Sequence, residues 1–426
     1  MKIDNPEPRR STNSAAREPG IVIAGAGHSA GRAAEALRGA GFEGRLILVG
    51  EEEWLPYERP HLSKDLLAGK ANLDTLYVRP AAWYEEQGIE MVLGTRIESI
   101  DRRAAQLRLA NGESIAYDRL LLATGARPRP LAVEGADLPG VQSIRNIGDT
   151  FALRKRLQPG ARLLIVGAGF IGLEVAAIAR ERGCAVTVLE AGPHPLGRVA
   201  PSSVGHFFAE LHRTHGVDLR LNSAITHIGR IGSREQLVAF ASDGFEWQGD
   251  VIVAGIGSLP NVELAADAGL AVDNGIRTDA WGRTEDAAIY AAGDATSHFN
   301  PLLGRHVRLE TWQNAQNQAI AVAKVMAGGD VPYSEVPWFW TDQYGVNFQS
   351  AGAQLAWDQV VWRGAPDSRQ CSAFYLQDGT VVGGATINQG RQMRVLKQMI
   401  ARAAKVDADL LQDASVPLEK LLLATA

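Results

Sequence analysis

Two β–α–β patterns emerge from the order of apolar and polar positions along the chain. The first has apolar runs at residues 21–24 and 45–49, with a segment of helical spacing at 29–38 between them. The second has apolar runs at residues 162–166 and 185–189, also with a helical segment between them. Short, continuous apolar runs are typical of strands buried in a parallel sheet. We therefore expect two parallel sheets, each opened by such a unit.

Further apolar runs extend these units. We expect several short strands between residues 91 and 117, and buried strands at 120–123, 250–257 and 287–295. A helix is expected at residues 311–326, and its buried face would carry Ala315, Ala319, Val322 and Met326.

After residue 331 the sequence changes to β-rich pieces with turns, followed by a helix expected at 391–405. This change indicates a separate C-terminal α+β domain. The predicted fold class is α/β, with two Rossmann-like dinucleotide-binding domains and a C-terminal α+β domain.

Composition and charge exclude several classes of protein. The 426 residues suffice for two or three domains, and 43 Lys and Arg against 48 Asp and Glu give no reason to expect nucleic-acid binding. No apolar run reaches the ~18 residues that cross a bilayer. Residues 1–19 are polar, with no apolar secretory segment, so we expect a flexible tail and a cytoplasmic protein without a membrane partner. Cys184 and Cys371 lie far apart and predict neither a disulfide framework nor a zinc site.

Each β–α–β pattern carries a glycine motif and an acid at the end of its second strand. The first motif has Gly25, Gly27 and Ala30 in the three glycine positions, with Glu51 as its acid; the second has Gly167, Gly169, Gly172 and Glu190. Such loops hold a dinucleotide pyrophosphate at a helix N-terminus, while the acid binds ribose hydroxyls. The alternative is a plain tight turn, and finding two complete motifs argues against it.

The acid of the second motif also bears on the choice of nicotinamide cofactor. A carboxylate at Glu190 would repel a 2′-phosphate and favours NADH over NADPH. His194 and Arg198 lie nearby in the sequence and can weaken this preference.

The segments ATGARPR (123–129) and AAIYAAGDA (287–295) resemble two linker motifs shared by the two-dinucleotide flavoproteins related to glutathione reductase. The segments PYERPHLSK (56–64), ETWQNAQNQ (310–318) and VPWFWTDQY (336–344) resemble a narrower family within them. That family is the ferredoxin reductases that serve Rieske-type oxygenases and some bacterial cytochromes P450. The resemblance covers residue 20 to the C-terminus. One departure is Gly345, where relatives commonly carry an acid, and this leaves the identity of the partner open.

The resemblance implies a division of labour between the two motifs. The first would bind FAD and the second NADH, so that hydride passes from NADH to FAD and single electrons then pass to a [2Fe-2S] ferredoxin of an oxygenase system. The implied domains are a discontinuous FAD-binding domain (20–145 and 263–332), an NADH-binding domain (146–262) and a C-terminal domain (333–426).

Three residues are the implied catalytic residues: Lys64, Glu174 and Trp312. Lys64 would lie beside the flavin and favour its reduced form, although an isolated lysine is usually a solvated surface residue. Glu174 would pair with Lys64 and orient the nicotinamide, or else only stabilise a helix N-terminus. Trp312 would lie near the flavin edge where the helix at 311–326 begins, or else belong to the core.

The resemblance also implies the remaining cofactor contacts. Asp294 would bind the ribityl chain, with a helix N-cap as the alternative, and Arg129 would reach the FAD pyrophosphate or adenosine, unless it is an exposed loop residue. The other expected FAD residues are Ser29, Ile97, Thr124 and Gly125, and the expected NADH residues beyond the glycine motif are Glu174, Glu190, Arg198 and Gly257.

The route of the electrons follows from what the motif lacks. Disulfide reductases and peroxidases of this superfamily have cysteine shortly after the ribose acid, where this chain has PYERPHLSK. A thiol relay is therefore excluded, and Cys184 and Cys371 are expected to be inert packing residues. The expected partner is an acidic [2Fe-2S] ferredoxin, which a basic helix face would steer into place. The alternative is that this basic face is only solvated and binds no partner. That face would consist of Arg391, Arg394, Arg402 and Lys405.

Two alternative functions remain open at this point. One is an NADH-sensing interaction protein resembling apoptosis-inducing factor, and the other is an NADH:quinone reductase. For the assembly we expect a monomer or a weak homodimer.

Overall fold

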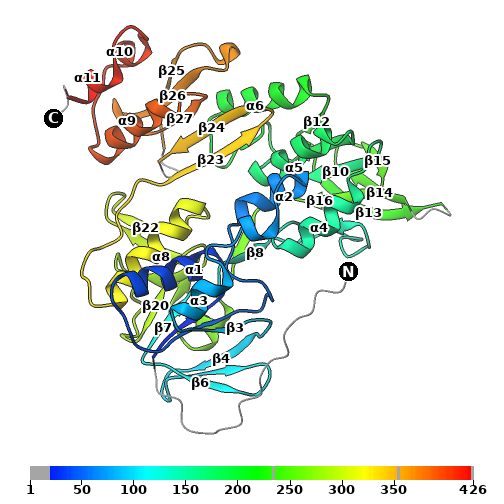
Figure 1. Ribbon diagram of the computed structural model, residues 1–426. Coiled ribbons are helices and arrows are strands. Elements are labelled where there is room, and N and C mark those ends of the chain that lie inside the picture. The colour runs from blue at the N-terminus through cyan, green and yellow to red at the C-terminus, as the bar shows by residue number, and fades with distance from the viewer. Residues whose placement is uncertain (1–19, 233–235, 353–355, 424–426) are drawn as a thin grey trace.

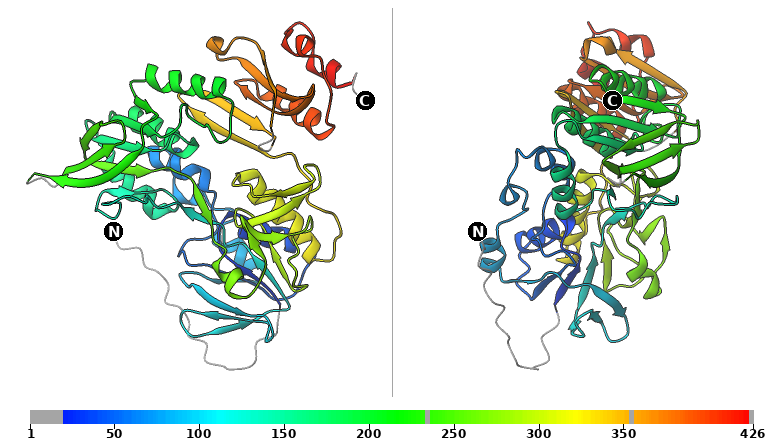
Figure 2. Two further views of the ribbon diagram at one scale, coloured as in Figure 1. Left: turned by 180° about the vertical axis from the view of Figure 1, so that it is seen from behind. Right: turned by 90° about the vertical axis from the view of Figure 1, so that its right-hand side faces the viewer.

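The computed structural model describes residues 20–232, 236–352 and 356–423, and the expected tail at 1–19 lies outside these ranges. The chain forms three domains. In Figure 1 the first lies at the bottom, the second at the upper right and the C-terminal domain at the upper left. The view from behind in Figure 2 shows the second and C-terminal domains side by side above the first.

The first domain is built on a parallel sheet with strand order β20–β7–β1–β2–β3. These strands span, in that order, Ile289–Ala291, Arg119–Leu122, Ile21–Ala24, Leu46–Val49 and Ile89–Val92. Ile21 and Ile23 of β1 pack beneath helices α1 (His28–Gly39) and α8 (Trp312–Met326), whereas Val22 and Ala24 belong to the core on the opposite face. Because both faces are covered, this strand contains no polar residue.

Smaller elements surround this sheet. They are α3 (Ala81–Glu86), β4 (Ile97–Asp101), β5 (Gln106–Leu109), β6 (Ser114–Ala116), α7 (Glu263–Asp267), β18 (Val272–Asp273), β19 (Gly275–Thr278), β21 (Thr296–Asn300) and β22 (Arg305–Val307). The short helix α2 (Asp65–Ala68) instead packs against the second domain, where Leu67 joins the core (Figure 1). Strands β4, β5 and β6 form the small antiparallel sheet at the bottom of Figure 1.

The second domain repeats the plan with a parallel sheet of order β12–β11–β10–β16–β9. Its strands span Asp218–Leu221, Ala185–Glu190, Arg162–Val166, Val251–Ala254 and Val141–Gln142. One face packs against helices α4 (Ile147–Arg156), α5 (Phe170–Glu181) and α6 (Ser202–Thr214). The other face packs against the sheet of β13 (Ile225–Ile231), β14 (Gln236–Ala241) and β15 (Glu246–Gly249). Two antiparallel strands, β8 (Ala126–Pro128) and β17 (Ser258–Pro260), connect this domain to the first.

The C-terminal domain is an antiparallel sheet of order β23–β24–β27–β26–β25. These strands span Trp338–Gln343, Val346–Ala351, Thr380–Ile387, Cys371–Gln377 and Gln359–Arg363, and the helices are α9 (Gly390–Ala401), α10 (Ala408–Gln412) and α11 (Leu418–Leu423). Phe374 lies in the core beneath these helices, whereas its neighbours Ala373 and Tyr375 join the core of the second domain. The sheet is therefore clamped between its own helices and the second domain.

The predicted fold class is confirmed, and so is the helix expected at 311–326, whose four expected core residues are all buried. Two expectations need correction. Strand β9 pairs with β16, and Leu131, Val133 and Leu138 pack on the same core, so the second domain begins well before the expected boundary at residue 146.

The second correction concerns the helix expected at 391–405, because α9 ends at Ala401. Ala403 adopts a left-handed φ of +48°, and the Ala404 amide turns back to bond the Met399 carbonyl at 2.9 Å. Such a left-handed residue terminates a helix. Lys405 instead forms a β-bridge with Thr380, so the four basic residues do not share one helix face.

Within the described part of the chain, no helix combines the length and the apolar character needed to cross a membrane.

Candidate active site

A large cavity lies where the three domains meet. Its volume is about 2250 Å³, and its lining includes both glycine loops, the segment around Lys64 and the start of the C-terminal domain. A pocket for one small ligand usually measures about 300–1,000 Å³. The cavity therefore has room for more than one ligand of nucleotide size.

The first glycine loop has a turn that only glycine can occupy. Gly25 has a φ of +124°, and a Cβ there would lie 2.3 Å from the carbonyl oxygen of Ala123. Helix α1 follows at once, with Gly27 as its N-cap, and Ser29 in its first turn lines the cavity. Because Gly27 has no side chain, the first-turn N–H groups of α1 have no capping side chain there. This end of the helix suits an anionic group such as a phosphate.

The second glycine loop repeats this geometry. Gly167 has a φ of +102°, and a Cβ there would lie 2.6 Å from the carbonyl oxygen of Gly255. Gly169 is the N-cap of α5, again without a capping side chain. The two loops thus present two equivalent anion sites to the same cavity.

The third position of each motif acts in packing and does not line the cavity. A Cβ on Gly172 would lie 2.2 Å from the carbonyl oxygen of Gly167, so only glycine lets α5 approach its own loop this closely. Ala30 is fully buried in the core under α1. Both residues help to position the loops, and neither faces the cavity in which a ligand would lie.

The two acids both line the cavity, but they differ in exposure and in hydrogen bonding. Glu51 follows β2 and is exposed. Glu190 ends β11, and its carboxylate oxygens accept hydrogen bonds from the backbone N–H groups of Ala168 and Gly192, each at 2.8 Å. Glu190 is therefore held rigidly beside the second glycine loop.

The expected pair of Lys64 and Glu174 is present. Lys64 Nζ lies 2.6 Å from Glu174 Oε1, although the two residues come from different domains and are 110 positions apart. Ser63 Oγ donates to Glu174 Oε2 at 2.5 Å, and Thr341 Oγ1 donates to Oε1 at 2.6 Å. Only 3% of Glu174 is exposed, so three donors satisfy a buried carboxylate at the wall of the cavity.

Trp312 lies at the first position of α8, and this helix begins at the cavity. Its indole stacks on His28, with ring centroids 5.5 Å apart, and meets Trp340 edge to face at 5.4 Å. Within the described residues, Trp312 Nε1 and both ring nitrogens of His28 have no hydrogen-bond partner. Burial lowers the pKa of His28 to about 3, with smaller contributions from Arg32 and Arg59, so its ring is neutral at neutral pH.

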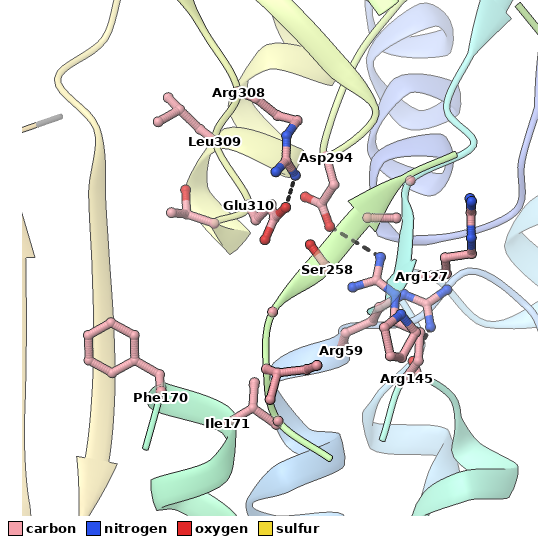
Figure 3. Close-up of a pocket in the computed structure, with 18 of the residues that line it drawn as sticks. Arg59, Arg127, Arg145, Phe170, Ile171, Ser258, Asp294, Arg308, Leu309 and Glu310 are labelled. Carbon is pink, nitrogen blue, oxygen red and sulfur yellow. Dashed lines mark hydrogen bonds and ion pairs between the residues drawn. The ribbon is translucent and has the colours of Figure 1, made fainter. Parts of the chain in front are cut away.

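A second charged cluster lies on the opposite wall of the cavity from Phe170 (Figure 3). Arg145 Nη2 lies 3.2 Å from Asp294 Oδ2, and Arg59 donates to Glu52 Oε1 at 2.7 Å and to the Tyr57 hydroxyl at 2.8 Å. Burial lowers the pKa of Arg145, with the nearby Arg59 adding to this effect. These are half-buried positive charges next to a site that suits phosphate.

The alternative role of Asp294 as a helix N-cap is wrong, because the next element is strand β21. Arg129 is exposed and does not line the cavity, because the chain turns away after β8 ends at Pro128. Arg127 lines the cavity instead and pairs with Glu263 at 2.6 Å. The remaining expected residues that line the cavity are Ile97, Thr124, Gly125, Arg198 and Gly257.

The sequence interpretation missed four residues of this site: His28, Arg59, Arg145 and Thr341. Three of them lie inside motifs that the sequence does offer: His28 in the first glycine motif, Arg59 in PYERPHLSK and Thr341 in VPWFWTDQY. Arg145 lies outside these motifs and directly precedes Asn146, which forms a capping box with Asp149 at the start of α4. An arginine at such a helix start is a candidate for anion binding.

The two cysteines are far from this chemistry. Cys184 and Cys371 are both free and buried, and neither lines the cavity. Burial raises the pKa of the Cys371 thiol to about 11 and also raises that of Cys184. Both thiols are therefore poor nucleophiles, as expected from the sequence.

Comparison with known proteins gives matches over nearly the whole chain. Residues 19–319 match the pyridine nucleotide-disulphide oxidoreductase family, and residues 338–422 match the reductase C-terminal domain. The chain is 44% identical to the ferredoxin–NAD(+) reductase component of an anthranilate 1,2-dioxygenase system from Burkholderia cepacia, covering 94% of this chain and 99% of that protein. It is 37% identical to putidaredoxin reductase from Pseudomonas putida, covering 95% and 97% of the two chains.

The fold agrees with these matches. The crystal structure of a covalent putidaredoxin reductase–putidaredoxin complex is similar, with a TM-score of 0.91, 36% identity, and coverage of 96% of this chain and 99% of that one. The two glycine loops, the shared cavity and these similarities lead to one conclusion: the chain belongs to the pyridine nucleotide-disulphide oxidoreductase family, in the branch that carries the reductase C-terminal domain.

Proposed function

We propose that this protein is an FAD-dependent NADH:ferredoxin reductase, which passes electrons from NADH through FAD to a [2Fe-2S] ferredoxin of an oxygenase system. The observation that carries this proposal is the single cavity into which both glycine loops open, with the Lys64–Glu174 pair in its wall. Relatives that share 37–44% of its residues over nearly the full length are named as reductases of this kind.

The residues of the first loop fit FAD. The glycine turn, the uncapped start of α1 and the arginines Arg59 and Arg145 suit a pyrophosphate, while Glu51 suits a ribose and Asp294 a ribityl chain. When bound, the flavin supplies the conversion between two-electron and one-electron chemistry. Lys64 then holds a positive charge in the cavity wall, and the N-terminus of α8 adds the positive end of its dipole. Both favour the more electron-rich state of the cofactor.

The residues of the second loop fit NADH. Glu190 ends β11 beside the second glycine loop, the position whose acid binds ribose hydroxyls in this kind of fold, and its carboxylate is fixed by two backbone N–H groups. We infer that this charge repels NADPH. Glu174, held by three donors, is suited to orient a nicotinamide carboxamide next to Lys64.

Electrons must leave the protein without a thiol relay, since both thiols are buried outside the cavity. A one-electron carrier protein meets this requirement. For its docking we retain Arg391 and Arg394, which are exposed one turn apart on α9. Arg402 and Lys405 lie beyond the helix end, and we assign them only a share of the same basic surface.

The test is NADH-driven reduction of cytochrome c by the purified protein, with and without a panel of [2Fe-2S] ferredoxins. Strong dependence on one ferredoxin supports the proposal and identifies the partner. Rapid reduction of bound flavin by NADH, without ferredoxin-dependent turnover for any member of the panel, would contradict it and favour a sensing role. Turnover with a quinone alone would favour quinone reduction.

A further inference from the structure

Thr341, in the first strand of the C-terminal domain, reaches into the active site of the other two domains. Its hydroxyl donates to Glu174 Oε1 at 2.6 Å, and both side chains are buried. The same carboxylate oxygen accepts the hydrogen bond from Lys64 Nζ. A residue outside both dinucleotide-binding domains therefore takes part in the central ion pair.

The contact follows from the periods of the two elements that meet. Phe339, Thr341 and Gln343 lie on one face of β23, because alternate residues of a strand point the same way. Phe170 and Glu174 share a face of α5, because they are four residues apart. The ring of Phe339 packs on that of Phe170, which Figure 3 labels at the start of α5, with centroids 4.0 Å apart. One turn further along α5, Thr341 then meets Glu174.

A buried hydrogen-bond chain fixes the direction of the Thr341 hydroxyl. Gln343 Nε2 donates to Thr341 Oγ1 at 3.1 Å, so the Gln343 oxygen is free to accept from His212 Nε2 at 2.7 Å. His212 is fully buried on α6, and burial lowers its pKa to about 4, which makes it a neutral donor. A hydroxyl has one proton to donate. The Gln343 amide occupies the hydroxyl oxygen as a donor and the Glu174 carboxylate can only accept, so the Thr341 proton is directed to Glu174.

We propose that Thr341 is a positioning residue of the active site: it holds the Glu174 carboxylate, and through it Lys64, in the place where the nicotinamide and the flavin meet. This inference rests on the proposed function for the roles of Lys64 and Glu174. It assigns to the C-terminal domain a part in the reaction of NADH, in addition to any part in docking a protein partner.

The test compares variants that remove or keep the hydroxyl. Thr341→Val removes it at equal size, and Thr341→Ser keeps it. Thr386→Val is the matched control, because Thr386 is equally buried in β27 of the same sheet and its Oγ1 has no hydrogen-bond partner among the described residues. Two quantities are measured on the FAD-loaded proteins: the midpoint potential of the flavin without NADH, and the limiting rate of anaerobic flavin reduction by NADH.

We expect Thr341→Val to lower the midpoint potential, because a less firmly held Lys64 stabilises the electron-rich flavin less. We also expect it to slow the limiting rate about tenfold, the size expected for one hydrogen bond to a charged group. Thr341→Ser and Thr386→Val should both keep the midpoint potential and the limiting rate of the original protein.

Equal values for Thr341→Val and Thr386→Val in both measurements would overturn the proposal. If Thr341→Val does not fold, Thr341→Ala removes the same hydroxyl and carries the same test. Failure of the proposed function is distinguishable, because it would appear as absent ferredoxin reduction by the unaltered protein. The comparison of flavin potentials among the variants does not depend on a ferredoxin.

Discussion

The rings of His28 and Trp312 are stacked at the mouth of the first glycine loop, with their planes inclined by 30°. A histidine that is 6% exposed, with both nitrogens unpartnered among the described residues, serves here as an apolar ring. Its charged form is strongly disfavoured, since burial lowers its pKa from the usual 6.5 to about 3.

This stacking predicts a specific acid sensitivity. Between pH 6.5 and pH 3 the unfolded chain binds a proton at His28 that the folded protein does not bind, so the free energy of unfolding falls as the pH falls through this window. His28→Phe keeps the stacking and removes this titration. From pH 7 to pH 5 the variant should lose about 2 kcal/mol less than the original protein. Urea unfolding at both pH values, with FAD in fixed excess, measures the difference. Parallel losses in the two proteins would contradict the prediction.

Glu190 predicts the choice between the two nicotinamide cofactors. Glu190→Gln keeps an acceptor oxygen for one of the two loop N–H groups and removes the negative charge. The ratio of kcat/KM for NADPH to that for NADH should then rise about tenfold, because the repulsion of a 2′-phosphate is gone. Glu51→Gln is the matched control at the first loop: it should weaken retention of FAD and leave the ratio unchanged. An unaltered ratio in Glu190→Gln would show that another group sets the preference.

The ion pair between the half-buried Lys64 and the buried Glu174 predicts that stability and rate respond differently to its removal. Lys64→Met leaves a buried carboxylate without its cation and should lower the free energy of unfolding by about 3 kcal/mol. The double variant Lys64→Met/Glu174→Gln removes both charges, so it should recover at least half of this loss. Flavin reduction by NADH should be slower in both variants than in the original protein. Chemical unfolding and stopped-flow absorbance measure the two effects, and additive losses of stability would argue against a coupled pair.

The basic face of α9 predicts an effect confined to the protein partner. The double reversal Arg391→Glu/Arg394→Glu should raise the KM for ferredoxin and flatten its dependence on salt, because steering by opposite charge is lost. Arg103→Glu/Arg108→Glu makes the same change of charge on the exposed β4–β5–β6 sheet, at the far end of the molecule in Figure 1. This control should leave the KM for ferredoxin unchanged. The rate of ferricyanide reduction should be unchanged in both variants. Equal effects of the two reversals would mean that only net charge matters.

Much of the first-order architecture could be predicted from local patterns. The turn glycines Gly25 and Gly167 are predictable from the sequence, because only glycine can take their positive φ and approach a neighbouring carbonyl so closely. The pairing of Lys64 with Glu174 required the family resemblance, because nothing local relates residues 110 positions apart.

The missed residues have contacts that arise only in three dimensions. Thr341 reads locally as one polar position in an aromatic strand, and its role depends on the docking of β23 onto α5. His28 reads as a polar residue and behaves as an apolar one, because α8 brings Trp312 against it. The end of α9 was missed because Ala403, which is neither glycine nor asparagine, takes the left-handed conformation that terminates the helix. Helical periodicity in the sequence continues beyond this point and gives no warning.

The pairing of β8 with β17 places Pro128 opposite Ser258, so the chain leaves the first domain and re-enters it at one spot. The residues between these strands, including β9 and the rest of the second sheet, form an insert whose two ends are neighbours. Such an insert can be exchanged as a cassette, because the remaining chain keeps its connectivity whatever is spliced between the two strands. In this architecture, exchanging this one segment could change the reductant that the protein accepts without altering the fold of the first domain.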